Sequence, residues 1–199
     1  VKYLSEKNFP FVTHGQTELF FQHPYYDVDN IGFIKKSLIY LKSKKIDEVI
    51  FVEPSKKFTY YNLSSKSLVD NAKKLNLKIN NKTNLSLEDS NLVFQNKILK
   101  VFNDNKNTKG IICGSDIKSL ILLSTLGYLG YQVNKDVYLI SKGIYSTPKY
   151  FYPKIPFFFE DMEEAGSRLG DFLLKRINGE KIDKLQMIDK IKYFNQEKK

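Results

Sequence analysis

Apolar runs and helical repeats alternate along the middle of the chain. Short apolar runs predict strands at residues 48–52, 77–79, 110–113 and 137–140. Between them, apolar residues recur at helical spacing in segments that begin near Asn30, after Asn62, and near Ser86 and Asp116. This alternation over residues 30–140 predicts an α/β lobe built on a doubly wound parallel sheet.

The stretch from Lys109 to Ser141 is the clearest succession of strand, helix and strand. We predict that Asp116 caps its helix and that Gly127 or Gly130 ends it. Two strands joined by a helix of this length run parallel, so both end at the same edge of the sheet. Open parallel sheets bind ligands in the crevice beyond that edge. The residues that follow each strand are therefore candidate ligand contacts.

Both ends of the chain follow another pattern. Residues 1–7 predict the end of a helix, and residues 9–13 predict a strand that runs into a polar loop. Residues 155–159 predict a further strand, followed by a helix that Asp161 caps and Asn178-Gly179 ends. So few elements cannot enclose a core. We therefore expect one complete lobe plus part of a second.

Composition places the chain among globular proteins, with 42% hydrophobic and 27% charged residues among 199. No apolar run approaches the roughly 20 residues that span a bilayer. The first residues lack the pattern of a signal peptide, so we expect a cytoplasmic protein without membrane contact. Cys113 is the only cysteine, which excludes an internal disulfide and fits a reducing compartment.

The net charge of +10 raises the question of nucleic-acid binding. All but two of the 32 basic residues are lysines, and they are spread along the chain without an arginine-rich run. A solvated basic surface is therefore the favoured interpretation over direct nucleic-acid contact.

The order of elements around residues 109–141 resembles a known family. Here a short strand is followed by the pair Ser115-Asp116, by an apolar helix ending in Leu-Gly-Tyr, and by the segment Val-Asn-Lys-Asp-Val before another strand. This order is similar to that of the effector-binding domain of the LacI/GalR transcriptional regulators. The resemblance implies a periplasmic-binding-protein-like fold. It implies a partial N-terminal lobe at 1–27 and 155–180, and a C-terminal lobe at 28–154 and 181–199. The front of the N-terminal lobe and a helix-turn-helix domain would lie outside this chain.

The resemblance also implies a function. A small sugar-like effector would bind between the lobes and bias their orientation, and DNA would be contacted only through the absent domain. Family members form homodimers through the helix that corresponds to residues 117–129. This helix is apolar around most of its circumference, so we expect Leu120, Leu122 and Leu123 at a dimer interface.

Candidate ligand contacts come from strand ends and from positions that match the family. They are His14, Gln16, Tyr60, Tyr61, Asn62, Ser115, Asp116, Lys142 and Glu160. Tyrosine rings can stack on the apolar faces of sugars, although ordinary packing at a helix start is an equal alternative. Asp116 and Glu160 can also be explained by the helices that follow them, because carboxylates favour helix N-termini.

The sequence departs from the family pattern at two places. The loop after the first strand has Gly15 and Gln16 where many members have an acidic residue and an arginine. Ser141-Lys142-Gly143 replaces a Gly-Tyr-Asp sequence whose aspartate binds sugar hydroxyls in the family. An acceptor is lost and a cation is gained, which suggests a ligand with negative charge, such as a sugar acid or a sugar phosphate.

Enzymatic chemistry is disfavoured. His14, His23 and Cys113 have no metal-ligand spacing, and neither a glycine-rich phosphate loop nor a nucleophile elbow is present. We expect no metal and no cofactor. The alternatives to a regulator are a sugar-binding protein of a transport system, which shares the two-lobe architecture, and a sugar-modifying enzyme.

Overall fold

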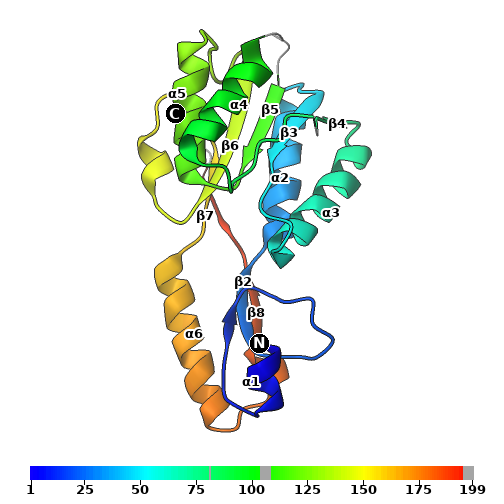
Figure 1. The fold of residues 1–199 in the computed structure, drawn as a ribbon, viewed down its shortest axis with the longest axis vertical. Helices are drawn as coiled ribbons and strands as arrows, with labels where there is room; N and C mark the ends of the chain where they lie inside the picture. The colour runs from blue at the N-terminus through cyan, green and yellow to red at the C-terminus, as the bar shows by residue number, and fades with distance from the viewer. Residues whose placement is uncertain (81, 104–108, 195–199) are drawn as a thin grey trace. The chain divides into compact units, whose positions relative to one another are not determined.

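A computed structural model describes residues 1–80, 82–103 and 109–194 of the chain (Figure 1). The chain divides into two compact units. The small unit consists of Val1–Asp29 and Asp161–Ile191, and the large unit of Asn30–Glu160 and Lys192–Lys199.

The large unit is built on a six-stranded sheet with the order β4-β3-β5-β6-β7-β9. The strands are β3 (Glu48–Val52), β4 (Lys78–Ile79), β5 (Lys109–Cys113), β6 (Val137–Gly143), β7 (Phe157–Phe159) and β9 (Lys192–Phe194). All neighbours pair in parallel except β7 and β9, which are antiparallel. The prediction of a doubly wound, mainly parallel α/β sheet is confirmed.

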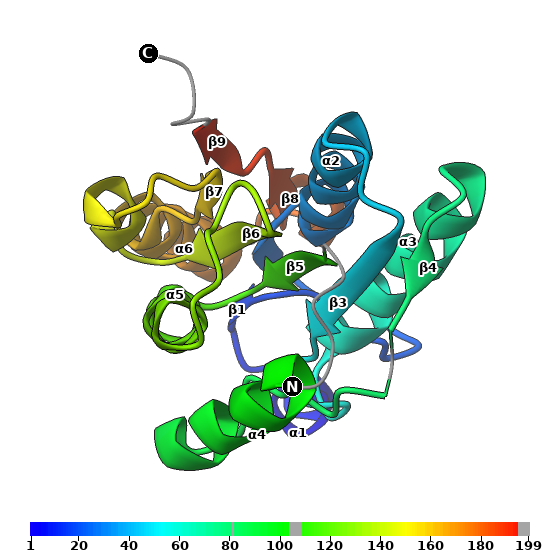
Figure 2. The same ribbon diagram turned by 90° about the horizontal axis from the view of Figure 1, so that it is seen from above.

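Helices cover both faces of this sheet (Figure 2). On one side, α2 (Asn30–Ser43) packs against α3 (Thr59–Lys74). On the other side, α4 (Asn91–Asn103) packs against α5 (Asp116–Tyr128). A short 3-10 helix, η1 (Thr147–Tyr150), follows β6. Because β3, β4, β5, β6 and β7 run parallel, their carboxyl ends lie at one edge of the sheet.

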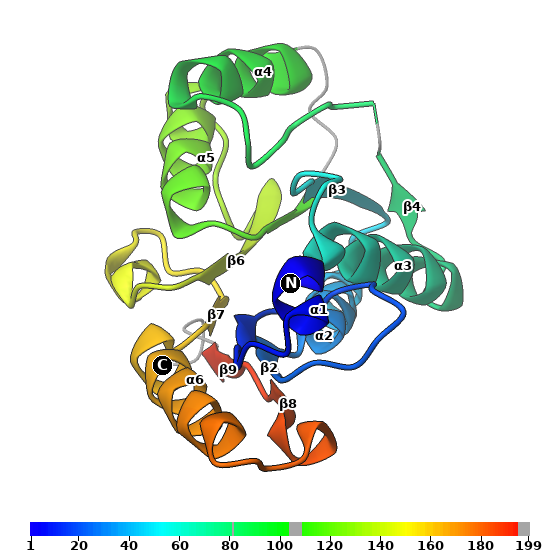
Figure 3. The ribbon, with the colours of Figure 1, turned by 60° about the horizontal axis from the view of Figure 1, so that its bottom comes forward.

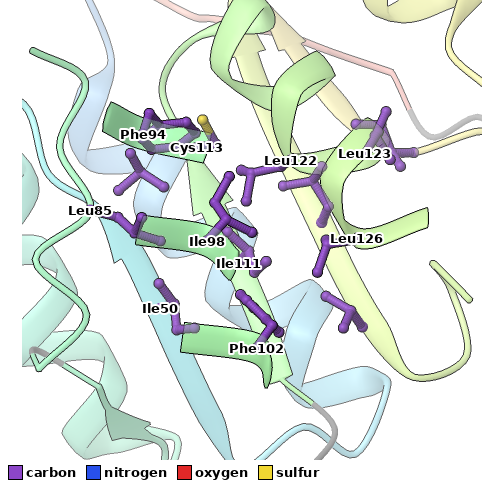
Figure 4. Close-up of a cluster of buried hydrophobic side chains, with 14 of the residues drawn as sticks. Ile50, Leu85, Phe94, Ile98, Phe102, Ile111, Cys113, Leu122, Leu123 and Leu126 are labelled. Atoms are coloured by element: carbon purple, nitrogen blue, oxygen red, sulfur yellow. The ribbon is translucent and has the colours of Figure 1, made fainter. Parts of the chain in front are cut away.

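The core between α4, α5 and the sheet explains why these elements hold together (Figure 4). Phe94 and Ile98 of α4, Leu122 and Leu126 of α5 and Ile111 of β5 are fully buried there. Burying one such side chain stabilises a fold by about 1.5–3 kcal/mol. The helical spacing of the apolar residues in α4 and α5 thus fixes the sides that face the sheet.

The small unit contains a three-stranded parallel sheet with the order β1-β2-β8 (Figure 3). Its strands are β1 (Thr13–His14), β2 (Tyr25–Val28) and β8 (Gln186–Asp189). Its helical segments are α1 (Lys2–Glu6), α6 (Met162–Ile177) and η2 (Ile182–Leu185), and α6 packs on β2. Asp161 caps α6 by accepting a hydrogen bond from the Glu164 backbone, as predicted. Gly179, at φ +85°, lies just past the helix end, also as predicted.

Several elements differ from the sequence prediction. Strands β2, β8 and β9 were not predicted. The helix expected to begin at residues 86–89 begins at Asn91 instead. Ser90 precedes it, and the Ser90 Oγ accepts a hydrogen bond from the Val93 backbone nitrogen.

The division into units also differs from the predicted lobes. Strand β7 pairs with β6 and so lies in the large unit, whereas residues 155–159 were expected in the small one. Strand β8 pairs with β2 in the small unit, whereas residues 181–191 were expected in the large one. Strand partners are chosen by long-range pairing, which the local pattern does not encode.

Candidate functional site

The carboxyl ends of β5, β6 and β7 bring several candidate residues together in the large unit. Asp116 follows β5, Lys142 lies near the end of β6, and Glu160 follows β7. Tyr60, from the start of α3, reaches the same edge: a Cβ on Gly114 would lie 2.5 Å from its hydroxyl oxygen. The expected convergence of the Ser115 loop, Lys142 and the Tyr60 region is therefore present.

Lys142 is the centre of this cluster and is only 7% exposed. Its Nζ donates hydrogen bonds to Asn30 Oδ1 at 2.8 Å and to Glu160 Oε2 at 3.3 Å. The same nitrogen lies 4.5 Å from the ring centroid of Tyr60 and 5.9 Å from that of Phe33. Glu160 balances the lysine charge inside the unit. Lys142 already has an anionic partner in Glu160, so the geometry does not support the expectation that it neutralises an acidic ligand.

Asp116 does not cap α5, and that prediction was wrong. Ser115 is the N-cap, with an extended backbone and an Oγ that accepts from the Lys118 backbone at 3.3 Å. Asp116 is already the first helical residue, and its Oδ1 accepts from the Ile117 backbone at 2.9 Å. Its Oδ2 is buried and has no hydrogen-bond partner among the described residues. A carboxylate oxygen is therefore left over for another donor.

Tyr60 is the tyrosine that joins the cluster. Its hydroxyl is buried and makes no hydrogen bond of normal geometry with the described residues. Burial raises the pKa of Tyr60, and the nearby Lys142 cation and Ser64 hydroxyl only partly offset this rise. Tyr61 is half-buried with Lys56 Nζ 5.8 Å from its ring centroid, and Asn62 is exposed. The sequence did not separate these three neighbours, since their order at a helix start says little about direction.

The small unit holds the other two candidates. The backbone nitrogen and the Nε2 of Gln16 both donate to Asp27 Oδ2, each at 3.1 Å. His14 is exposed and stacks on Tyr26 with ring centroids 6.2 Å apart. Asp27 is buried at the sheet and orients the loop after β1, a role that the sequence did not reveal. Its position inside the apolar-flanked run Tyr-Tyr-Asp-Val was the available signal.

The predicted dimer residues fall into two classes. Leu122 and Leu123 are buried in the core of the large unit, so they offer no free surface. Leu120 is 51% exposed and lies with Ile117 on the outer side of α5. A groove of about 390 Å³ runs between α4 and α5, lined by Asn91, Leu92, Gln95, Leu120, Ile121 and Ser124. Any partner of α5 would meet this outer side.

Two features are absent from residues 1–80, 82–103 and 109–194. In these ranges no three His, Cys, Asp or Glu side chains come together in a way that could hold a metal ion. In the same part of the chain, no helix combines the length and the apolar character needed to cross a bilayer.

Comparison with known proteins gives a clear answer at the level of structure. No protein-family model matches the sequence, and no curated protein matches it. A LacI-family regulatory protein from Chloroflexus aggregans, at 14% identity, matches 96% of this chain and 69% of its own with a TM-score of 0.84. This chain has the fold of a LacI-family regulator.

Two other LacI-family structures agree. A transcription regulator from Clostridium acetobutylicum is 16% identical, with 96% of this chain and 73% of its own matched at a TM-score of 0.79. A regulator from Enterococcus faecalis V583 with bound ribose is 15% identical, with 98% and 70% matched at 0.78. Each LacI-type chain is longer than this one, so the matched region comprises one complete lobe and part of a second, as predicted.

Proposed function

We propose that this chain is the effector-sensing region of a LacI-type transcriptional regulator and binds a small hydroxyl-rich ligand at the strand-end edge of the large unit. One observation carries the proposal. Asp116 Oδ2 and the Tyr60 hydroxyl lie at this edge as buried polar atoms that make no normal hydrogen bond with the described part of the chain. A buried, unsatisfied polar group costs about 1–3 kcal/mol, and a ligand hydroxyl would remove that cost.

The charge of the cluster favours a neutral ligand over an acidic one. Lys142 and Glu160 cancel each other, and Asp116 adds an uncompensated carboxylate oxygen. Asp116 would repel a second anion, whereas a ligand hydroxyl could donate a hydrogen bond to its carboxylate. Neutral sugars supply such donors, and ribose is bound in the Enterococcus faecalis regulator.

Regulation would follow from the two-unit construction. A ligand that binds one conformation of the sensing region more tightly shifts the population toward that conformation, and a DNA-binding domain outside this chain would read that shift. The outer side of α4 and α5, with Leu92, Ile117 and Leu120 exposed, would form a homodimer interface. A regulator of this kind would act in the cytoplasm.

Isothermal titration calorimetry with a panel of neutral and acidic sugars, including D-ribose and gluconate, tests the proposal. We expect a neutral sugar to bind, and Asp116→Asn to weaken that binding by about tenfold or more, since a hydrogen bond to a charged group is lost. Asp70→Asn on the exposed surface of α3 is the matched control and should bind as the unaltered chain does. Equal binding by the Asp116 variant, or binding of acidic sugars only, would contradict the proposal.

A further inference from the structure

The surroundings of Lys142 have the composition of a binding pocket for an organic ammonium ion. Two oxygens, Asn30 Oδ1 and Glu160 Oε2, accept hydrogen bonds from Nζ. Two aromatic rings, Tyr60 and Phe33, lie within 6 Å of the same nitrogen. A carboxylate supplies charge, an amide supplies a neutral acceptor, and ring faces attract cations.

These four residues lie on parts of the large unit other than β6, the strand that carries the lysine. Asn30 and Phe33 lie on α2, Tyr60 lies on α3, and Glu160 follows β7. Phe33 is fully buried and packs edge-on against Phe158, with ring centroids 5.0 Å apart. The Glu160 backbone nitrogen donates to the Gly143 carbonyl at 3.0 Å. Removing the lysine side chain would therefore leave a pocket whose walls belong to the sheet and its helices.

A second buried lysine shows that such surroundings are not shared by every buried lysine of the unit. Lys118 Nζ donates to Asn91 Oδ1 at 2.9 Å and to the Asp89 backbone carbonyl, and lies 5.1 Å from the Phe94 ring centroid. These contacts join α5 to α4 and to the loop before it, and they involve a carbonyl where Lys142 meets a carboxylate. Lys118 thus offers a matched comparison for the contribution of the carboxylate.

We propose that Asn30, Phe33, Tyr60 and Glu160 form a binding subsite for a primary ammonium group, and that Lys142 of the same chain occupies it. Resting on the proposed function, this makes Lys142 an internal competitor of the effector. A tethered group acts at a high effective concentration, so a neutral sugar hydroxyl does not displace it. An effector therefore either binds outside this subsite, or carries an amine that replaces the Lys142 ammonium there.

Chemical rescue tests the subsite without any sugar. Lys142→Ala removes three methylenes and the ammonium, which are the atoms of n-propylammonium. We expect propylammonium chloride to raise the melting temperature of this variant saturably, with half-saturation at roughly 1–10 mM, which is within the affinity limit for a ligand of four non-hydrogen atoms. Sodium chloride at equal ionic strength and 1-propanol should have no saturable effect. The unaltered chain should not respond, because its subsite is filled.

Two further variants sharpen the test. Adding Glu160→Gln to Lys142→Ala should abolish the preference for propylammonium over 1-propanol, because the carboxylate is gone. Lys118→Ala should show a smaller preference than Lys142→Ala. If Lys142→Ala does not fold by itself, it is refolded with each additive, and propylammonium alone should restore the folded signal.

Equal effects of 1-propanol and propylammonium, or an equal response of the unaltered chain, would overturn the subsite. The outcome is independent of the sugar titration. Rescue without sugar binding would refute the sensor function and leave the ammonium subsite standing, and sugar binding without rescue would do the reverse.

Discussion

Gly143 and Asp116 approach so closely that a Cβ on residue 143 would lie 2.8 Å from the Asp116 Cβ and 2.9 Å from its Oδ2. The end of β6 thus touches the first turn of α5 through a glycine. Contacts this short do not occur between real side chains, so a methyl group must push Asp116 away or bend the strand.

We predict that Gly143→Ala lowers the free energy of unfolding by about 1–3 kcal/mol, the usual cost of overpacking. Gly127→Ala is the control, because Gly127 is helical and nothing lies within 4 Å of its Cβ position. That substitution should stabilise the chain by about 0.5–1 kcal/mol. Urea denaturation measures both, and a neutral Gly143 variant would contradict the tight contact.

The two leucine classes of α5 should differ in stability. Leu122→Ala removes a fully buried side chain and should cost about 2–5 kcal/mol, including the cavity that remains. Leu120→Ala, at a half-exposed position, should change stability by less than about 1 kcal/mol. Similar losses for the two variants would show that the core does not lie where Leu122 is placed.

Oligomeric state separates the roles of the same helix. Leu120→Lys keeps the core intact and places a charge beside the groove between α4 and α5. If this side forms a homodimer, sedimentation velocity should show monomers for the variant and dimers for the unaltered chain. Lys135→Glu, an exposed charge change outside the groove, should leave the dimer as it is. An unaffected dimer in the Leu120 variant would move the interface elsewhere.

Stability of the small unit should depend on pH through His23. This residue is buried, and burial lowers its pKa below the ordinary value of 6.5, with a smaller contribution from the N-terminal charge. The unfolded chain then binds a proton more readily than the folded one. The free energy of unfolding is therefore highest above pH 6.5. It falls as the pH drops from there towards the lower pKa of His23 in the folded state.

Urea unfolding between about pH 7.5 and about pH 5.5, the range around an ordinary histidine pKa, should therefore show falling stability. His23→Gln should flatten this dependence, whereas His14→Gln, at an exposed position, should retain it. The same slope in both variants would assign the effect to another group.

Cys113 should be inert in the native state. The thiol lies fully buried in β5, and burial raises its pKa to about 11, although hydrogen bonds with Ser119 and Ser115 act in the other direction. Because it is the only cysteine, thiol labelling at about pH 8 reports opening of the large unit alone. We expect slow labelling that Leu122→Ala accelerates. Labelling of the native chain as fast as that of the denatured chain would contradict this burial.

Most of the local structure could be predicted from the amino-acid sequence alone. The apolar runs at β3 and β5, the apolar side of α4 and α5, and the cap of α6 at Asp161 were all recognisable. These signals depend on residues within about one helical turn or one strand, where spacing and capping chemistry decide the outcome. The alternation of such elements was enough to predict the parallel α/β sheet.

The pairing of the strands and of the buried charges became clear only from the three-dimensional fold. β7 joined the large sheet and β8 the small one, through partners far away in sequence. Lys142 donates a hydrogen bond to Asn30, 112 positions away in sequence, and forms an ion pair with Glu160. The sequence alone did not show that the Lys142 ammonium already has these partners. The physical reason is that burial and electrostatic pairing depend on distance in space, which a linear pattern does not specify.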